Sequence, residues 1–177
     1  PDSVATTTFS AAIDPSTLGE GVVVYDATTS TMLDPPEAVA SLDAASAGQE
    51  LVISTKSRWR NGHTYFVGLF SWQEAGAVRG IRSADAKPVL TDSAFALLRS
   101  PTPLLAKCQD ATNPICLCDN LADSACHAVV DGISSTQARQ LEAARLGIGP
   151  IIDSVLGLRG RTRSELVMAW SFTISKR

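Results

Sequence analysis

The strongest pattern in the chain is a run of nine residues near its end, Leu166-Val167-Met168-Ala169-Trp170-Ser171-Phe172-Thr173-Ile174. Every second residue from Leu166 to Ile174 is large and apolar, which predicts a β-strand with one apolar face. Five such side chains need a second layer to cover them. At about 25 cal/mol per Å2 and on the order of 100–200 Å2 each, their burial contributes on the order of ten kcal/mol. We therefore expect this strand to close a sheet built from earlier parts of the chain.

The first half of the chain reads as short strands separated by turns. We expect strands over residues 9–13, 21–26, 51–55 and 65–72, and an edge strand over 88–90. Residues 65–72 are apolar on both faces and should form a central strand. Asp34-Pro35-Pro36 cannot lie in a central strand, because two prolines remove two backbone donors. Asn61-Gly62 predicts a turn, and Asp92 a cap for a short helical turn.

Residues 101–160 differ in character and begin after Pro101 and Pro103. A cysteine segment leads to a helix that starts near Ser134, where Gln137 completes a capping box. Pro150 lies within the helical pattern and predicts a kink or two short helices. Because the strand at 166–174 returns to a sheet, we expect one domain over residues 1–177, with residues 101–160 as a helical insertion.

Three short stretches resemble the SbsA-type bacterial Ig-like domains. These are residues 9–18 with the valine-rich run at 22–26, the corner at 61–67, and Ala169-Trp170-Ser171-Phe172-Thr173. The resemblance covers the first hundred residues and the last strand, and Asn61-Gly62 stands where the family has proline and glycine. It implies a mostly β chain with an Ig-like β-sandwich, and it implies export. Residues 101–160 are not part of the family's domain, so the expected fold is an Ig-like β-sandwich with a disulfide-stapled α-helical insertion before the last strand. The family occurs in bacterial surface proteins, lipoproteins and the N-terminal regions of some secreted lipases, and it has no catalytic residues.

The four cysteines of the chain lie within 19 residues of one another, at Cys108, Cys116, Cys118 and Cys126. An even, clustered set predicts two disulfides in an oxidising compartment. Cys116 and Cys118 are too close to pair without strain, which leaves a sequential pairing, somewhat favoured, or a crossed one. The alternative is a zinc site of four cysteines, or of three with His127, although Cys-x-Cys fits the usual ligand spacing poorly.

Other candidate sites are weaker. There is no Gly-x-Ser-x-Gly motif, and His63 is expected as an exposed turn residue. His127 follows Cys126, but adjacent side chains rarely face one another. The remaining candidates are calcium at Asp110, Asp119, Asp123 and Asp131, a sugar platform of Trp59, Trp72 and Trp170, and an anion site at Arg159, Arg161 and Arg163. We expect solvated loop carboxylates, core tryptophans (Trp59 is left unassigned) and a solvated basic turn instead.

The composition places the chain among exported β proteins. Apolar residues make up 45%, charged residues only 19%, and the net charge of −3 offers no attraction for nucleic acid. No apolar run is long enough to span a membrane. The chain opens at Pro1 rather than Met, so we expect the natural protein to continue beyond it.

These observations predict a protein without enzymatic activity, metal or cofactor. We expect a structural or interaction module of a secreted or cell-surface bacterial protein, which contacts neighbouring domains of the same polypeptide or a surface partner. The alternative is the N-terminal accessory domain of a secreted lipase or esterase whose catalytic region lies outside this chain.

Overall fold

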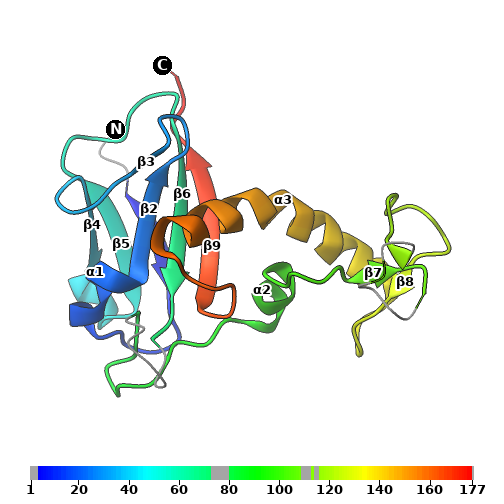
Figure 1. Cartoon of the computed structure of the whole chain (residues 1–177). Coiled ribbons are helices and arrows are strands. Elements are labelled where there is room, and N and C mark those ends of the chain that lie inside the picture. Colours follow the sequence, from blue (N-terminus) through cyan, green and yellow to red (C-terminus); the bar gives the residue numbers. More distant parts are fainter. Residues whose placement is uncertain (1–3, 73–79, 109–112, 114–115, 177) are drawn as a thin grey trace.

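The computed structural model describes residues 4–72, 80–108, 113 and 116–176. The chain is mostly β, and its strands pair antiparallel in three sheets (Figure 1). The four-stranded sheet has the order β3 (Thr31–Met32), β2 (Val22–Asp26), β6 (Thr64–Phe70) and β9 (Leu166–Thr173). The three-stranded sheet has the order β1 (Ala5–Thr8), β5 (Glu50–Thr55) and β4 (Ala38–Leu42). A small ribbon joins β7 (Leu105–Ala106) to β8 (His127–Ala128).

In the described parts of the chain, five helical elements with defined bounds connect or cover these sheets. Two are single 3-10 turns, η1 (Pro15–Thr17) and η2 (Ala44–Ser46). Two are short helices, α1 (Leu18–Gly21) and α2 (Ser93–Leu98), and Asp92 caps α2 as its sequence predicts. The fifth, α3 (Ser135–Arg159), has 25 residues and begins with the expected capping box of Ser134 and Gln137.

Two hydrophobic clusters lie on opposite faces of the four-stranded sheet. The first is shared with the three-stranded sheet and includes Leu51 and Ile53 of β5 and Tyr65, Val67 and Leu69 of β6. The second lies under the helices, and its buried members are Val23, Phe70, Phe95, Ile152, Val155, Leu166 and Ala169. Strand β6 therefore has an apolar partner on both faces, as expected for a central strand. The four-stranded sheet forms the middle layer of the body.

The last strand returns to the first half of the chain, because β9 pairs with β6 from Thr64↔Thr173 to Phe70↔Leu166. The predicted strict alternation fails at one point. Leu69 faces Met168 while Phe70 faces Leu166, so Val167 is an extra residue in a β-bulge. The bulge turns Leu166 to the helix side, while Val167 packs in the cluster between the sheets. Four of the five predicted side chains, Met168, Trp170, Phe172 and Ile174, pack together on one face.

Two other expectations are wrong, and one of the two alternatives expected at Pro150, a division into two short helices, is wrong as well. Residues 9–13 are not a strand, because β1 ends at Thr8 and Ile13 forms only an isolated bridge. Residues 88–90 likewise form only a bridge at Pro88. Helix α3 is continuous through Pro150 rather than divided in two. Both Pro150 and Leu146 are exposed, so the Leu146 carbonyl that loses its helical partner lies on the solvent side, where water can bond to it.

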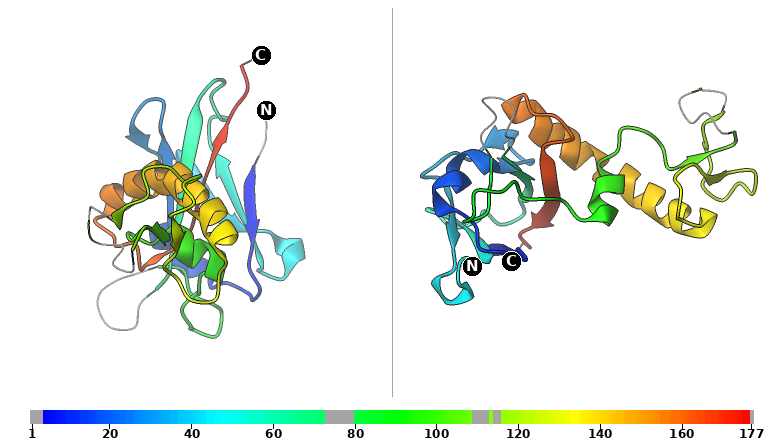
Figure 2. Two further views of the ribbon diagram at one scale, coloured as in Figure 1. Left: turned by 90° about the vertical axis from the view of Figure 1, so that its right-hand side faces the viewer. Right: turned by 90° about the horizontal axis from the view of Figure 1, so that it is seen from below.

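Helix α3 extends far beyond the sheets that it covers. At about 1.5 Å per residue it is about 37 Å long. Its C-terminal part packs on the four-stranded sheet, and its N-terminal part ends beside the ribbon of β7 and β8. The views in Figure 1 and Figure 2 place that ribbon well away from the body, at the end of the helix. We call residues 135–147 the arm and the described part of residues 104–133 the lobe.

Candidate functional site

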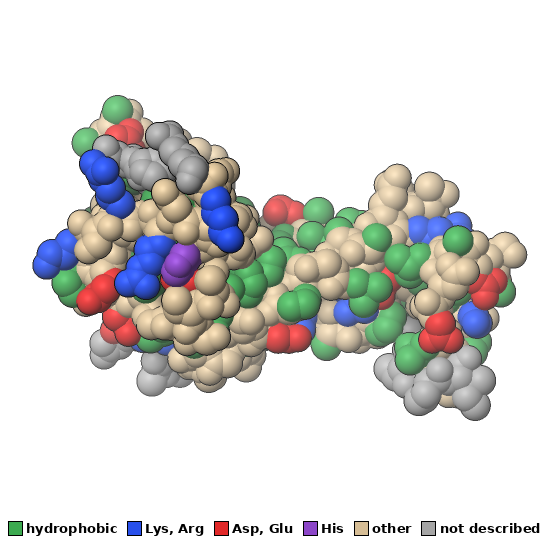
Figure 3. Space-filling model, turned by 90° about the horizontal axis from the view of Figure 1, so that it is seen from above, with side chains coloured by type: hydrophobic (Ala, Val, Ile, Leu, Met, Phe, Trp, Pro, Cys, Tyr) green, Lys and Arg blue, Asp and Glu red, His purple; other side chains and the backbone are tan. Residues whose placement is uncertain are grey.

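The lobe at the end of the arm is the most distinctive part of the molecule. Figure 3 shows it as a separate mass joined to the body by a narrow neck, with hydrophobic side chains exposed along the neck. Leu146 on the arm is 56% exposed and Leu117 in the lobe is 36% exposed. The arm and lobe therefore present surface that the body does not cover.

Two disulfides hold the lobe together, which confirms that prediction and contradicts the zinc alternative. The pairing is sequential, with Cys108 joined to Cys116 and Cys118 joined to Cys126. The Cα atoms are 5.3 Å and 6.1 Å apart, within the usual range for disulfides. Among the described residues where the lobe meets α3, the buried cluster members are Leu105, Cys126 and Ala138 in one cluster and Ala106 and Cys116 in another. So small a core needs covalent support.

A buried ion pair anchors the lobe to α3. Glu142 is 4% exposed, and its Oε1 and Oε2 lie 2.6 Å and 2.7 Å from the Arg145 guanidinium. The backbone N–H of Leu104 donates to Oε2 at 2.9 Å. Burial alone would raise the pKa of Glu142, but the hydrogen bonds from Arg145 and Leu104 outweigh it and hold that pKa below its usual range. The start of the lobe is thereby fixed to the arm.

A second arginine of α3, Arg139, also bonds to the lobe. The Arg139 guanidinium donates to the backbone carbonyls of Leu121, Asp123 and Cys126 at 2.9–3.2 Å. These carbonyls belong to the loop that the second disulfide closes. One helix side chain therefore satisfies three acceptors that have no partner in a strand. Neither Arg139 nor Glu142 was predicted from the sequence as a functional residue. For Glu142 a signal exists, because Glu142 and Arg145 have the i, i+3 spacing of a helical ion pair.

The body carries one Asp–His pair. His63 Nδ1 lies 2.8 Å from Asp26 Oδ2, and their side chains are 20% and 3% exposed. Asp26 also accepts from the backbone N–H groups of Thr28 and Thr29. Burial would raise the pKa of Asp26, but the hydrogen bonds from His63 and Thr29 outweigh it and lower that pKa. His63 is therefore a half-buried partner of Asp26, and its expected place as an exposed turn residue is wrong.

The Asp–His pair lacks a nucleophile. Among the described residues, no serine, threonine or cysteine side chain hydrogen-bonds to the His63 ring, which instead stacks on Tyr65 with centroids 6.3 Å apart. A hydrolytic triad requires that hydrogen bond. The pair joins the end of β2 to the turn before β6, a structural use of both side chains.

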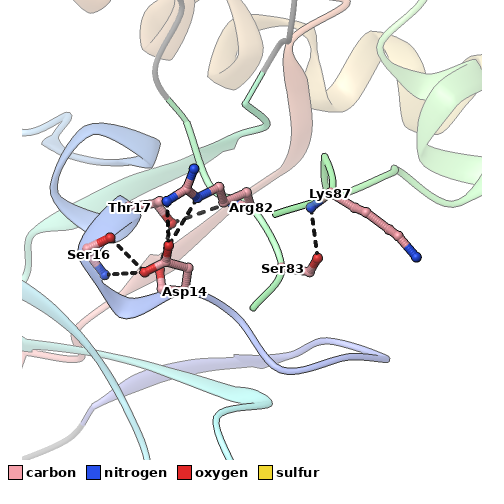
Figure 4. A network of polar contacts seen from close by, with 6 residues as sticks. All are labelled: Asp14, Ser16, Thr17, Arg82, Ser83 and Lys87. Carbon is pink, nitrogen blue, oxygen red and sulfur yellow. Dashed lines mark hydrogen bonds and ion pairs between the residues drawn. The ribbon is translucent and has the colours of Figure 1, made fainter. Parts of the chain in front are cut away.

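A polar network ties the start of the chain to residues 81–87 (Figure 4). Asp14 accepts from Arg82 Nε and Nη2 at 3.0 Å and 2.8 Å, and from the Ser16 backbone and hydroxyl. The hydrogen bonds from Ser16 and Arg82 lower the pKa of Asp14. Ser83 accepts from the Lys87 backbone N–H, while the Lys87 ammonium points away from the network in Figure 4. The two charged groups at the centre of this network, the Asp14 carboxylate and the Arg82 guanidinium, are therefore paired with each other.

The arginine run follows the end of α3, where Arg159 is exposed as expected, but all three arginines also contact carboxylates. Arg159 lies 3.1 Å from Asp34, and Arg163 contacts Asp153. Arg161 lies 3.7 Å from Glu165 and over the Phe70 ring at 5.5 Å. The contacts of Arg159 with Asp34 and of Arg161 with Phe70 join the end of α3 to the strands and loops of the body.

The remaining candidate residues, for a sugar platform and a calcium site, do not form a site in the described parts of the chain. Trp59 is 3% exposed and packs edge-on against Tyr65 and Phe172, so it is a core residue rather than part of a sugar platform. Asp123 pairs with Lys107, and Asp110 lies outside the described residues. Within the described ranges, no three His, Cys, Asp or Glu side chains are grouped so that they could hold a metal ion. No helix in the same ranges combines the length and hydropathy needed to cross a bilayer.

No model of a known protein family matches the chain, and no curated protein matches it.

Proposed function

We propose that the chain is a non-catalytic interaction module of an exported bacterial protein. In this proposal the body is an Ig-like β-sandwich and residues 101–160 are a disulfide-stapled insertion. The insertion would present the lobe to a neighbouring domain of the same polypeptide or to a surface partner. The resemblance of residues 9–26 and 169–173 to SbsA-type domains supports the fold and the compartment. Two disulfides are typical of an oxidising compartment.

The observation that carries the proposal is the arm. A lobe with almost no core of its own is held at the end of a long helix by two disulfides, by Arg139 and by the Glu142–Arg145 pair. These contacts are far from the body and add nothing to its two hydrophobic clusters. Their effect is to fix the position of the lobe relative to the body, which is what a presented contact surface requires.

The test measures whether the lobe is rigidly presented. Nitroxide labels are attached at Asp131→Cys in the lobe and Ser41→Cys on β4, and the doubly labelled protein is diluted with unlabelled protein. Pulsed electron spin resonance should give one narrow distance distribution. Arg139→Ala should broaden it, while Arg60→Ala, a substitution in the body, should leave it unchanged. A distribution as broad as that of a flexible linker in the parent protein would refute the proposal.

The non-catalytic part of the proposal has its own test. Chromogenic esters and peptides should be hydrolysed no faster with the protein than without it, because no nucleophile in the described ranges hydrogen-bonds to His63. The His63→Ala and His127→Ala proteins should give the same background rate. A rate above background that either substitution abolishes would show that the chain is an enzyme.

A further inference from the structure

The end of the body at which β6 begins and β9 ends carries a concentration of positive charge. Residues 51–73 and 166–177 contain five of the chain's 15 lysine and arginine residues and none of its 18 aspartate and glutamate residues. The two segments meet here, because Gly62 donates its N–H to the Ile174 carbonyl at 2.7 Å. Figure 3 looks down on this end and shows lysine and arginine side chains on either side of a histidine. We use the name basic face for the side chains of Lys56, Arg58, Arg60 and Lys176.

The loop that carries three of these cations is held by a buried tryptophan. Trp59 lies between Arg58 and Arg60 in the sequence and is 3% exposed. Its ring packs edge-on against Tyr65, with centroids 4.7 Å apart, and the Tyr65 hydroxyl accepts the Arg60 N–H at 3.0 Å. Because the middle of the loop is anchored in the core, Lys56, Arg58 and Arg60 are presented to solvent from a fixed backbone.

The fourth cation, Lys176, comes from the segment that follows β9. A Cβ added at Gly62 would lie 2.7 Å from Lys176 Cε and 3.0 Å from Lys176 Cγ. The Lys176 side chain therefore lies across the loop at Gly62, in space that a larger residue would fill. This packing places a second cation-bearing segment directly against the first.

Three of these cations have no counter-charge in the described parts of the chain. The side chains of Lys56, Arg60 and Lys176 form no ion pair and no hydrogen bond there. Like charges gathered on one surface repel one another, most strongly at low ionic strength. The free protein bears this repulsion, and an anionic ligand relieves it.

The carboxylates near the basic face do not neutralise it. Asp26 lies under the face, where its side chain is 3% exposed and bonded to His63. Asp34 and Glu37 line a hollow beside the face, and Asp34 pairs with Arg159 at 3.1 Å. Of these three carboxylates, only that of Glu37 has no cationic partner in the described ranges. The face therefore keeps a net positive charge.

We propose that the basic face binds an acidic polysaccharide, independently of the lobe. Its cations suit carboxylate groups, to which guanidinium and ammonium groups donate charge-assisted hydrogen bonds. Exposed hydroxyl and amide side chains lie among the cations, at Ser57, Asn61 and Ser175. These groups both donate and accept hydrogen bonds, as sugar hydroxyls do. A polymer that repeats a carboxylate and several hydroxyls along its length therefore matches both kinds of group on the face.

Two other polyanions match the face less well. Proteins that bind single-stranded nucleic acid stack the bases on aromatic side chains, but none of the described aromatic residues in 51–73 and 166–177 is exposed. Peripheral membrane helices bury apolar side chains below the lipid headgroups, but every large apolar residue that is exposed in the described chain lies outside these two segments. The face therefore offers charge and hydrogen bonds without a stacking or inserting side chain.

The test measures binding of polygalacturonate fragments by isothermal titration calorimetry. The dissociation constant of the parent protein should rise more than about tenfold between about 50 mM and about 200 mM salt, because each charged contact displaces counterions. Lys56→Gln combined with Lys176→Gln should weaken binding more than about tenfold at the lower salt concentration. The matched control, Lys87→Gln combined with Lys107→Gln, removes the same charge away from the face and should bind as the parent does. Circular dichroism checks that both variants are folded.

Three outcomes would overturn the proposal. The first is a parent protein that does not bind the fragments at the lower salt concentration. The second is an equal loss of affinity in the two double variants, which would show that net charge alone decides binding. The third is tighter binding of single-stranded DNA or of phosphatidylglycerol vesicles than of the fragments, which would assign the face to nucleic acid or to a membrane.

Discussion

Glu142 is the buried charge on which the junction between arm and lobe depends. It is the acceptor for Arg145 and for the Leu104 backbone, and both donors are themselves shielded from water. Removing one partner of such a group leaves the other buried without a counter-charge, which costs more than the pair contributes. Single substitutions at this position should therefore have large effects.

We predict that Glu142→Gln lowers the free energy of unfolding by about 2 kcal/mol. The glutamine can still accept from Leu104, but it leaves the Arg145 charge unpaired. Urea denaturation measures the change, and Glu37→Gln, at an exposed position, is the control. Equal midpoints for the two variants would mean that the buried pair does not stabilise the fold.

The same residue determines part of the pH dependence of stability. The pKa of Glu142 is lower in the folded protein than its ordinary value of 4.5. Its contribution is therefore present above that value and is lost as the pH falls through the lower folded value. Asp26 and Asp14 act in the same direction, because their pKa values are also lowered. Thermal melts between pH 7 and pH 3 should show a loss below about pH 4.5 that is smaller in Glu142→Gln.

At the scale of elements, the contact between α3 and β6 depends on one glycine. A Cβ added at Gly68 would lie 3.0 Å from Val155 Cγ2 and 3.1 Å from Val155 Cβ. The absence of a side chain there lets the helix approach the sheet. The four-stranded sheet can therefore carry a buried cluster on its helix side as well as on its other face.

We predict that Gly68→Ala destabilises the protein by about 1–2 kcal/mol, because the helix must move outward. Gly157→Ala is the matched comparison. Gly157 lies in α3, the helix of Val155, with nothing within 4 Å of an added Cβ. Its replacement by alanine should stabilise the protein by about 0.5–1 kcal/mol. Chemical denaturation of both variants measures the two signs, and a stable Gly68→Ala protein would show that the helix contact is loose.

Some elements could be predicted from the sequence and others could not. Strands β2, β5 and β6 have continuous β-branched or aromatic runs, and α3 has both of its caps. Strand β4 was missed because Ala38-Val39-Ala40-Ser41-Leu42 is small and weakly patterned. The bulge at Val167 could not be foreseen, since Leu166 and Val167 are both apolar and either fits either face.

The candidate site was predictable only where the signal was local. The cysteine spacing gave both disulfides, because each loop is short and contains turn-forming residues. The Asp26–His63 pair joins residues 37 apart. Its geometry depends on how β2 and β6 pair, which no local pattern contains.

For the whole molecule, the separation of body and lobe predicts different responses to reduction. The two hydrophobic clusters of the body contain no cysteine. We predict that a reductant unfolds the lobe and leaves the near-ultraviolet circular dichroism of buried Trp59 unchanged. Before reduction, the intact mass should lie about four hydrogens below the fully reduced value. Loss of the Trp59 signal on reduction would mean that lobe and body unfold as one unit.

The pairing of β6 with β9 also has a consequence for synthesis on the ribosome. Thr64 on β6 pairs with Thr173 on β9, which is synthesised 109 residues later. The four-stranded sheet therefore lacks its last strand while more than half of the chain is translated. Loop closure over so long a segment is slow compared with local helix formation. The α3 region can therefore form before the body closes. Nascent chains halted before residue 166 should remain sensitive to proteases across the body, and release of the last strand should be the step that makes the body resistant.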